Sequence, residues 1–185
     1  MFDITDFVNN YYPKIRETGL FVEDDVETAI QRMEAFPADM LEDLHEEGRL
    51  MFLFVSLHIA DAFDVDMEGL EYKDFLRKVQ DISSGELVFE DAQQVVSKET
   101  YEKGTGIEEV SFKCNGREYS FIAEFNYDWF DGRFIHYLNT VLEKQGLEKR
   151  LIVFGEPNGY LFTYKKPEFI ETFKSIFPTL EVELA

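Results

Sequence analysis

Two alternating stretches joined by Asn115-Gly116 constrain the fold of this chain more than any other feature. Asn-Gly favours a two-residue type I′ turn, because both residues tolerate the positive φ that this turn requires. A two-residue loop also fixes the strand register over residues 108–126. The predicted cross-strand pairs are Cys114 with Arg117, Lys113 with Glu118, Phe112 with Tyr119 and Val110 with Phe121. The hairpin therefore presents one apolar face to a core, while its other face carries an opposite-charge pair.

The composition indicates a folded and very acidic protein. The 185 residues are 45% hydrophobic and 16% aromatic, which argues against disorder despite a formal net charge of −20. One cysteine excludes an internal disulfide framework, and no basic and then apolar segment opens the sequence, so we expect a cytoplasmic protein. The longest apolar run, near residues 50–55, is too short for a membrane span. The negative charge disfavours nucleic acid and favours a basic protein as partner.

The first 85 residues are predicted to be helical. Apolar spacing predicts helices over 2–17, over 24–36 and around 72–79. Pro13 should end or kink the first of these at about Tyr12. Another helix should begin at Pro37 and either end at Gly48 or continue through the apolar run to about Ala62. Residues 64–69 are predicted to form a loop.

The second half alternates strands and helices. Weak alternation over 93–102 and the hairpin predict a three-stranded meander. A helix should cover 133–145 with Gly146 just past its end, and a second hairpin should pair 151–154 with 160–164 through a turn at 156–159. Pro167 should open a last helix.

The predicted fold class is α+β. We expect a helical N-terminal half followed by a five-stranded, mainly antiparallel sheet in the order βββ-α-ββ-α, with helices packed against it. The helical region should cover 1–85 and the α+β region 86–185, together forming one compact domain. The helical half either forms a separate lobe or covers a face of the sheet.

Negative charge is concentrated in residues 23–68, where 14 acidic residues against two arginines give a net charge of −12. Glu42, Asp43, Glu46 and Glu47 are predicted to lie on one side of a single helix, opposite its apolar side, where like charges repel. Such a cluster is either a solvated face or a docking surface for a basic protein. These four residues are candidate partner-binding residues.

A second acidic group contributes Asp64, Asp66 and Glu68. Its spacing, followed by Gly69, is similar to the start of a calcium loop, but the twelfth position is Phe75 where such a loop needs glutamate. We therefore interpret it as an acidic loop between helices and as a candidate part of the partner-binding surface.

Catalytic and metal motifs are not assembled in the sequence. His45, His58 and His136 lie in no two-histidine zinc pattern, and His58 is expected to be a hydrogen-bonded core residue. Cys114 precedes the hairpin turn, with no recognisable base, so an ordinary strand residue is the better interpretation. We predict no metal, cofactor or catalytic residues.

Aromatic residues Tyr127, Trp129 and Phe130 occupy the predicted turn between the sheet and a helix. They either close the end of the core or anchor a partner, because tyrosine and tryptophan are enriched among binding hot spots. Trp129 is expected to be at least partly buried.

The stretch from Gly106 to Phe177, with its Asn-Gly hairpin, Asp128-Trp129-Phe130-Asp131 and closing helix, resembles small bacterial immunity proteins of polymorphic toxin systems. The resemblance implies a cytoplasmic protein that binds and neutralises a toxin domain, and it supplies no catalytic residue. Our leading hypothesis is thus a non-enzymatic protein that binds a basic partner. The alternatives are a hydrolytic enzyme that uses carboxylates or a metal held by Asp64, Asp66 and Glu68, and a structural or scaffold subunit.

Overall fold

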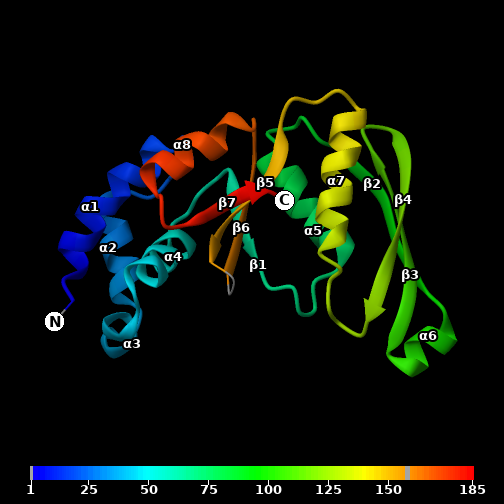
Figure 1. Cartoon of the computed structure of the whole chain (residues 1–185), viewed down its shortest axis with the longest axis horizontal. Coiled ribbons are helices and arrows are strands. Elements are labelled where there is room, and N and C mark those ends of the chain that lie inside the picture. Colours follow the sequence, from blue (N-terminus) through cyan, green and yellow to red (C-terminus); the bar gives the residue numbers. More distant parts are fainter. Residues whose placement is uncertain (1, 157–158) are drawn as a thin grey trace.

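The computed structural model describes residues 2–156 and 159–185 and has an α+β architecture (Figure 1). The elements, in chain order, are α1 (Ile4–Glu17), α2 (Val26–Glu34), α3 (Ala38–Asp43), α4 (Glu46–Ser56), β1 (Ala62–Val65), α5 (Tyr72–Ile82), β2 (Phe89–Val96), α6 (Lys98–Lys103), β3 (Thr105–Cys114), β4 (Arg117–Asn126), α7 (Arg133–Lys144), β5 (Arg150–Glu156), β6 (Gly159–Lys165), α8 (Glu168–Ile176) and β7 (Glu181–Leu184).

The strands form two antiparallel sheets, so the prediction of a single five-stranded sheet was wrong. One sheet has the order β1-β6-β5-β7, and the other has the order β2-β3-β4. β1 and β7 have only four residues each, too few for a clear alternating pattern. β1 pairs with β6 from about a hundred residues away, a contact that local pattern does not encode.

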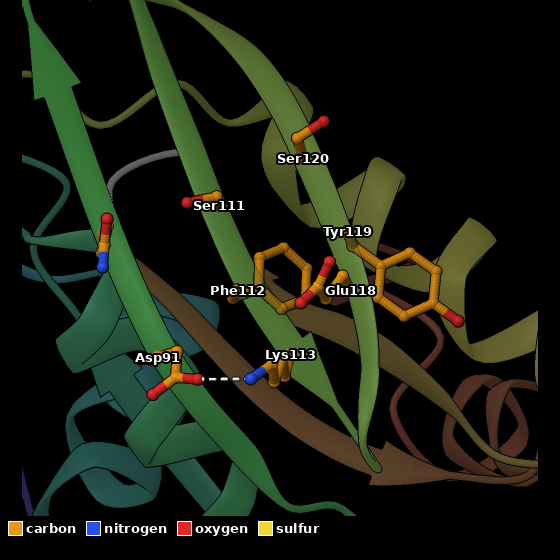
Figure 2. Close-up of a pocket in the computed structure, with 8 residues that line it drawn as sticks. Asp91, Ser111, Phe112, Lys113, Glu118, Tyr119 and Ser120 are labelled. Carbon is orange, nitrogen blue, oxygen red and sulfur yellow. Dashed lines mark hydrogen bonds and ion pairs between the residues drawn. The ribbon is translucent and has the colours of Figure 1, made fainter.

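Helices and sheets alternate across the molecule in successive layers (Figure 1). Helices α1, α2, α4 and α8 cover one face of the four-stranded sheet, and α5 and α7 cover its other face. The three-stranded sheet packs on the far side of α5 and α7. Its opposite face is not covered by any described element, and the hollow in Figure 2 lies on that face.

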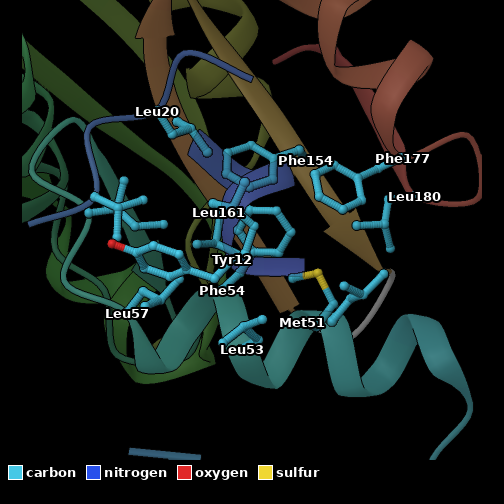
Figure 3. Packing of buried hydrophobic residues seen from close by; sticks show 14 of the residues in the cluster. Tyr12, Leu20, Met51, Leu53, Phe54, Leu57, Phe154, Leu161, Phe177 and Leu180 are labelled. Carbon is cyan, nitrogen blue, oxygen red and sulfur yellow. The ribbon is translucent and has the colours of Figure 1, made fainter. Parts of the chain in front are cut away.

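The four-stranded sheet is buried on both faces. Ile152 and Phe154 of β5 belong to the core beneath the N-terminal helices, whereas Leu151 and Val153 belong to the core beneath α5 and α7. In Figure 3, Phe154 lies beside Phe54 of α4, with ring centroids 5.4 Å apart. Burying a phenylalanine contributes about 1.5–3 kcal/mol. A strand covered on both faces reads as a continuous apolar run, as residues 151–154 do.

The opening hairpin has the predicted register. Cys114 pairs with Arg117, and Val110 pairs with Phe121. Asn115 and Gly116 have φ of 50° and 75°, as a type I′ turn requires. The second hairpin is also present, with residue 156 opposite 159, but its predicted turn includes residues 157–158, which lie outside the described residues.

Three local features differ from the prediction, and the first is that Pro13 does not end its helix. It lies inside α1, which continues to Glu17. Asn9, whose carbonyl loses its usual donor at Pro13, is exposed as Pro13 is, so water can hydrate that carbonyl.

The second difference is a break between α3 and α4 at residues 44–45, so the chain neither ends a helix at Gly48 nor continues it to Ala62. Arg49 donates from Nε to the Leu41 carbonyl at 2.7 Å and from Nη2 to the Glu42 carbonyl at 2.8 Å. These bonds satisfy carbonyls at the end of α3 and stabilise the break. After α4, residues 62–65 form β1 rather than a helix end and loop.

The third difference concerns the predicted strand over 93–102. β2 ends at Val96, and residues 98–103 form α6. The Ser97 hydroxyl accepts from the Thr100 amide at 3.1 Å and so caps the helix. Gly104 ends it in the left-handed conformation.

Candidate functional site

A groove of about 590 Å³ opens between the start of α5, strand β2 and the end of β4 beside α6. We call it the aromatic groove. Its lining includes Tyr72, Gln94, Val96, Tyr101, Phe125 and Tyr127. Glu71, Lys73 and Gln93 also line it, so the groove combines aromatic rings with polar and charged groups.

Three rings form one side of the aromatic groove. Phe125 is 5% exposed and lies between Tyr101 and Tyr127, which are 66% and 64% exposed. The centroid distances are 6.3 Å from Tyr101 to Phe125 and 6.5 Å from Phe125 to Tyr127. One buried ring thus supports two largely exposed tyrosines at the edge of the groove.

Tyr127 adopts an uncommon backbone conformation. Its φ is 51°, in the left-handed region, and its amide donates to the Gly104 carbonyl at 3.2 Å. For a bulky residue this conformation is unfavourable by about 1–2 kcal/mol. The side chain stays 64% exposed in this conformation, so Tyr127 is a candidate contact residue.

The structure brings Glu68 and Trp129 together. They form an isolated antiparallel bridge, flanked by hydrogen bonds from the Gly69 amide to the Asp128 carbonyl at 2.6 Å and from the Phe130 amide to the Met67 carbonyl at 3.0 Å. The β1–α5 and β4–α7 connections therefore run side by side. Two sequence-predicted partner-binding groups meet here, next to Tyr127.

The three aromatic residues of the β4–α7 connection play two different roles. Phe130 is buried, with its ring 4.6 Å from that of Tyr72, and closes the core. Tyr127 and Trp129 are 64% and 54% exposed, so the interpretation that they close the core was wrong for both. Phe130 packs beside Phe134 of α7, whereas Tyr127 and Trp129 point outward.

The side chains of Asp64, Asp66 and Glu68 are exposed and alternate with inward-facing Val65 and Met67. The Asp66 carboxylate accepts from the Glu68 amide at 3.0 Å and forms a local turn. In the described residues no group of three or more histidine, cysteine, aspartate or glutamate side chains is placed to hold a metal ion.

The other predicted acidic group lies on two helices, so its placement on a single helix was wrong. Glu42 and Asp43 end α3, whereas Glu46 and Glu47 begin α4. Figure 1 places α3 and α4 on the opposite side of the molecule from β4 and α6. The predicted partner-binding residues therefore form two separate surfaces.

Two of these carboxylates also bind α1 and the residues before it. Glu42 accepts from the Phe2 amide at 3.3 Å, and Glu46 accepts from the Tyr11 hydroxyl. The pKa of Tyr11 rises to about 12 because of burial, the hydrogen bond to Glu46 and the negative charges of Glu46 and Glu47. Part of the acidic group thus has a structural role.

A second hollow, of about 440 Å³, lies on the uncovered face of the three-stranded sheet (Figure 2). Lys113 donates to Asp91 there at 2.6 Å, although its cross-strand partner is Glu118 as predicted. The hydrogen bond to Asp91 raises the pKa of Lys113. Lys113 therefore stays cationic and is not activated as a base for the nearby hydroxyls of Ser111 and Ser120.

The histidine prediction needs one correction. His58 lies beyond the end of α4, with a side chain that is 64% exposed and an Nδ1 3.1 Å from the Glu23 carboxylate. It is not a core residue, because α4 ends at Ser56 and the chain then turns toward Val22.

Glu108 is a buried residue of this region that the sequence interpretation missed. It is 3% exposed on the inner face of β3, and its Oε2 accepts from Gln94 Nε2 at 2.6 Å. Strand alternation could have identified it, because residues 108, 110 and 112 face the same side of β3 and Val110 and Phe112 face inward. Nothing comparable in the sequence indicates Tyr101 or Gln94.

Tyr72 connects Glu108 to the turn before α7. Its hydroxyl oxygen accepts from the Asp131 amide at 3.2 Å. Burial raises the pKa of Tyr72 most, the bond from the Asp131 amide opposes the rise, and the charge of Glu108, the hydrogen bond to Glu108 and the charge of Asp131 raise the pKa further. Tyr72 therefore remains a neutral hydroxyl beside the buried carboxylate.

Comparisons of the chain with protein-family models, with curated proteins and with solved structures found no match. Within residues 2–156 and 159–185, no helix combines the length and the apolar character needed to cross a membrane.

Proposed function

We propose that this protein is a non-enzymatic binding protein for a basic protein partner. The observation that carries the proposal is the display of Tyr127, a strained and exposed aromatic residue, at the mouth of the aromatic groove. The contact surface consists of Tyr101, Tyr127 and Trp129 with the adjacent β1–α5 connection. Exposed tyrosine and tryptophan side chains beside a pocket have the character of interface anchors.

Charge supports a basic partner. The net charge of −20 produces a field that attracts cationic surfaces and raises their rate of association. Asp64, in β1, and Asp66 and Glu68, on the connection that borders Trp129, place exposed carboxylates on this side of the molecule. The aromatic side chains then supply the short-range contacts, while the acidic residues favour encounter and orientation.

A specific form of this proposal is an immunity protein that occludes a basic toxin domain. The acidic balance supports it, as does the resemblance of residues 106–177 to immunity proteins. A genomic neighbour that encodes a toxin would be the direct evidence for it.

Affinity capture at low and high salt tests the proposal. We expect the wild-type protein to retain a specific basic partner at low salt and release it at high salt. Tyr127→Ala and Trp129→Ala should each weaken capture by about tenfold or more, as hot-spot truncations do. Phe21→Ala is the matched control, because Phe21 is 62% exposed but lies between α1 and α2.

A second pair of variants distinguishes the two acidic surfaces. Asp64→Asn with Glu68→Gln should slow association, whereas Asp43→Asn with Glu47→Gln, on α3 and α4, should change it less. Capture that is insensitive to Tyr127 and Trp129 but lost on neutralising α3 and α4 would move the interface to the helical side. The absence of any captured basic protein under all conditions would contradict the proposal.

A further inference from the structure

Glu108 is a buried carboxylate without a cationic partner in the described part of the chain. It is 3% exposed, and it accepts hydrogen bonds from two neutral groups, the amide of Gln94 and the hydroxyl of Tyr72. No lysine, arginine or histidine of the described residues lies within 4.0 Å of its oxygens. Burying a carboxylate with no cation beside it is unfavourable, so its presence calls for an explanation.

The location of Glu108 supplies that explanation. It pairs across the sheet with Val96 and Ala123 on the face that carries Gln94. Val96 and Gln94 line the aromatic groove, so Glu108 lies beside them on the same sheet face, next to the groove. Because the Gln94 Nε2 donates to Glu108, the Gln94 Oε1 is the acceptor that remains for a group in the groove.

The walls of the aromatic groove suit an organic cation. Tyr101 and Tyr127 are exposed, and Phe125 supports them from behind. A cation over such rings is attracted by their negative faces, and the attraction is stronger where water is excluded. Lys73, which also lines the groove, does not fill this role, because its ammonium pairs with Glu71 at 2.5 Å.

We infer that the aromatic groove receives an arginine or lysine side chain of the partner, held against Tyr101 and Tyr127 with its charge directed toward Glu108 through Gln94. The inference rests on the proposed function and names the group that the partner presents. A guanidinium suits the site especially well, because its plane stacks on tyrosine while its N–H groups donate to the Gln94 carbonyl.

A nuclear magnetic resonance titration of the full chain tests the inference. The probe is N-acetyl-arginine methylamide, and the signal is the side-chain amide of Gln94. N-acetyl-citrulline methylamide is the neutral control, because it has nearly the same shape without the charge. We expect saturable shifts with the arginine probe. The citrulline probe should bind at least about fivefold more weakly, and a fivefold ratio of dissociation constants corresponds to about 1 kcal/mol of binding free energy.

Two matched variants locate the charge effect. Glu108→Gln should weaken binding of the arginine probe about fivefold, whereas Glu109→Gln should leave it nearly unchanged. Glu109 is the adjacent residue on the exposed face of β3, so both variants remove the same charge. If Glu108→Gln fails to fold, Tyr101→Ala replaces it, because Tyr101 is 66% exposed and its removal should also weaken binding.

The outcomes separate the inference from the proposed function. Equal binding of the arginine and citrulline probes, or binding unaffected by both Glu108→Gln and Tyr101→Ala, overturns the inference. A partner captured through Tyr127 without arginine binding overturns the inference and leaves the proposed function standing. Arginine binding that depends on Glu108, with no protein captured, supports the cation site and contradicts the proposed function.

Discussion

The ring of Tyr127 lies directly over the backbone of Gly104, so closely that a Cβ added at Gly104 would be 1.9 Å from the Tyr127 Cζ. Gly104 ends α6 with a φ of 74°, and Tyr127 follows β4 with a φ of 51°. Two left-handed residues, 23 positions apart in the sequence, thus fix one exposed ring beside the aromatic groove. This contact explains why a glycine is required at the end of α6.

Gly104→Ala should therefore displace Tyr127 and destabilise the protein. An alanine in the left-handed conformation lowers the free energy of unfolding by about 1 kcal/mol relative to glycine, and the displacement of the Tyr127 ring lowers it further. Urea unfolding should show a decrease of about 1–2 kcal/mol in the free energy of unfolding. In a Tyr127→Ala background the same substitution should cost less, because the clash is absent. An equal effect in both backgrounds would mean that the ring contact has no energetic weight.

Asn139 of α7 links the helix to the four-stranded sheet. Its Oδ1 accepts from the Leu151 amide at 2.8 Å, and its Nδ2 donates to the carbonyls of Leu151 and Ala185 at 2.9 and 2.6 Å. Asn139→Leu should leave buried backbone groups without these partners and lower the free energy of unfolding by about 2–4 kcal/mol. Thermal and urea unfolding measure the change. Thr140→Ala, on the exposed side of α7, is the control and should have an effect below about 0.5 kcal/mol.

How far the sequence predicts this fold depends on how local each signal is. The register around Asn115-Gly116 was predicted correctly, because a turn and a period of two determine it within 19 residues. The helix faces of α5 and α7 follow equally from local spacing. The pairing of β1 with β6 was missed, since it depends on the tertiary arrangement of two cores.

The candidate site was only partly predictable. Trp129 and Glu68 were identified separately, and nothing in the sequence indicates that they form a bridge. The break between α3 and α4 depends on Arg49, which reaches back to the Leu41 carbonyl from the next helix. The alternation of side chains along the hairpin predicts that Glu108 faces inward. Its place beside the aromatic groove depends on α5 and α6, which complete that groove.

Asp131 should contribute stability that depends on pH. Burial raises its pKa, but hydrogen bonds from Arg133 and from the Glu124 and Arg133 amides outweigh burial and hold the pKa below its usual value. A depressed pKa in the folded state stabilises the protein above the unfolded pKa of about 4, and this contribution is lost as pH falls through the folded pKa. Asp131→Asn should therefore destabilise the protein more at about pH 7, above the unfolded pKa, than at about pH 3, below it.

Urea unfolding of Asp131→Asn and of the wild type at both pH values measures this difference. Asp128→Asn is the control, because the Asp128 side chain is exposed on the same connection. Its effect should be nearly the same at the two pH values. An effect of Asp131→Asn that is equally independent of pH would show that the ion pair with Arg133 does not contribute to folding.

Tyr11 and Glu46 provide a titration that reports on the acidic corner of α4. Burial, the hydrogen bond to Glu46 and the charges of Glu46 and Glu47 raise the pKa of Tyr11 to about 12. Its raised pKa stabilises the fold below the unfolded pKa of about 10, and this contribution is lost as pH rises through about 12. Glu46→Gln should lower the pKa of Tyr11, as followed by the carbon shift of labelled tyrosine. Glu42→Gln should leave it nearly unchanged, and an equal decrease in both variants would exclude a specific role for Glu46.

The side chain of Asn115 extends the role of the hairpin turn beyond its backbone conformation. Its Oδ1 accepts from the Val88 amide at 2.9 Å, and its Nδ2 donates to the Glu86 carbonyl at 3.2 Å and to Gln145 Oε1 at 3.1 Å. The turn thus binds the segment before β2 and the end of α7.

Asn115→Gly separates these two roles, because glycine adopts the positive φ but forms none of the side-chain bonds. We expect it to lower the free energy of unfolding by about 1–3 kcal/mol, chiefly because the Val88 amide loses its acceptor. Asn115→Asp keeps that acceptor and tolerates positive φ, so it should cost less. Urea unfolding and amide hydrogen exchange at Val88 measure both effects. A glycine variant as stable as the wild type, with Val88 still protected, would mean that the turn conformation alone accounts for the asparagine.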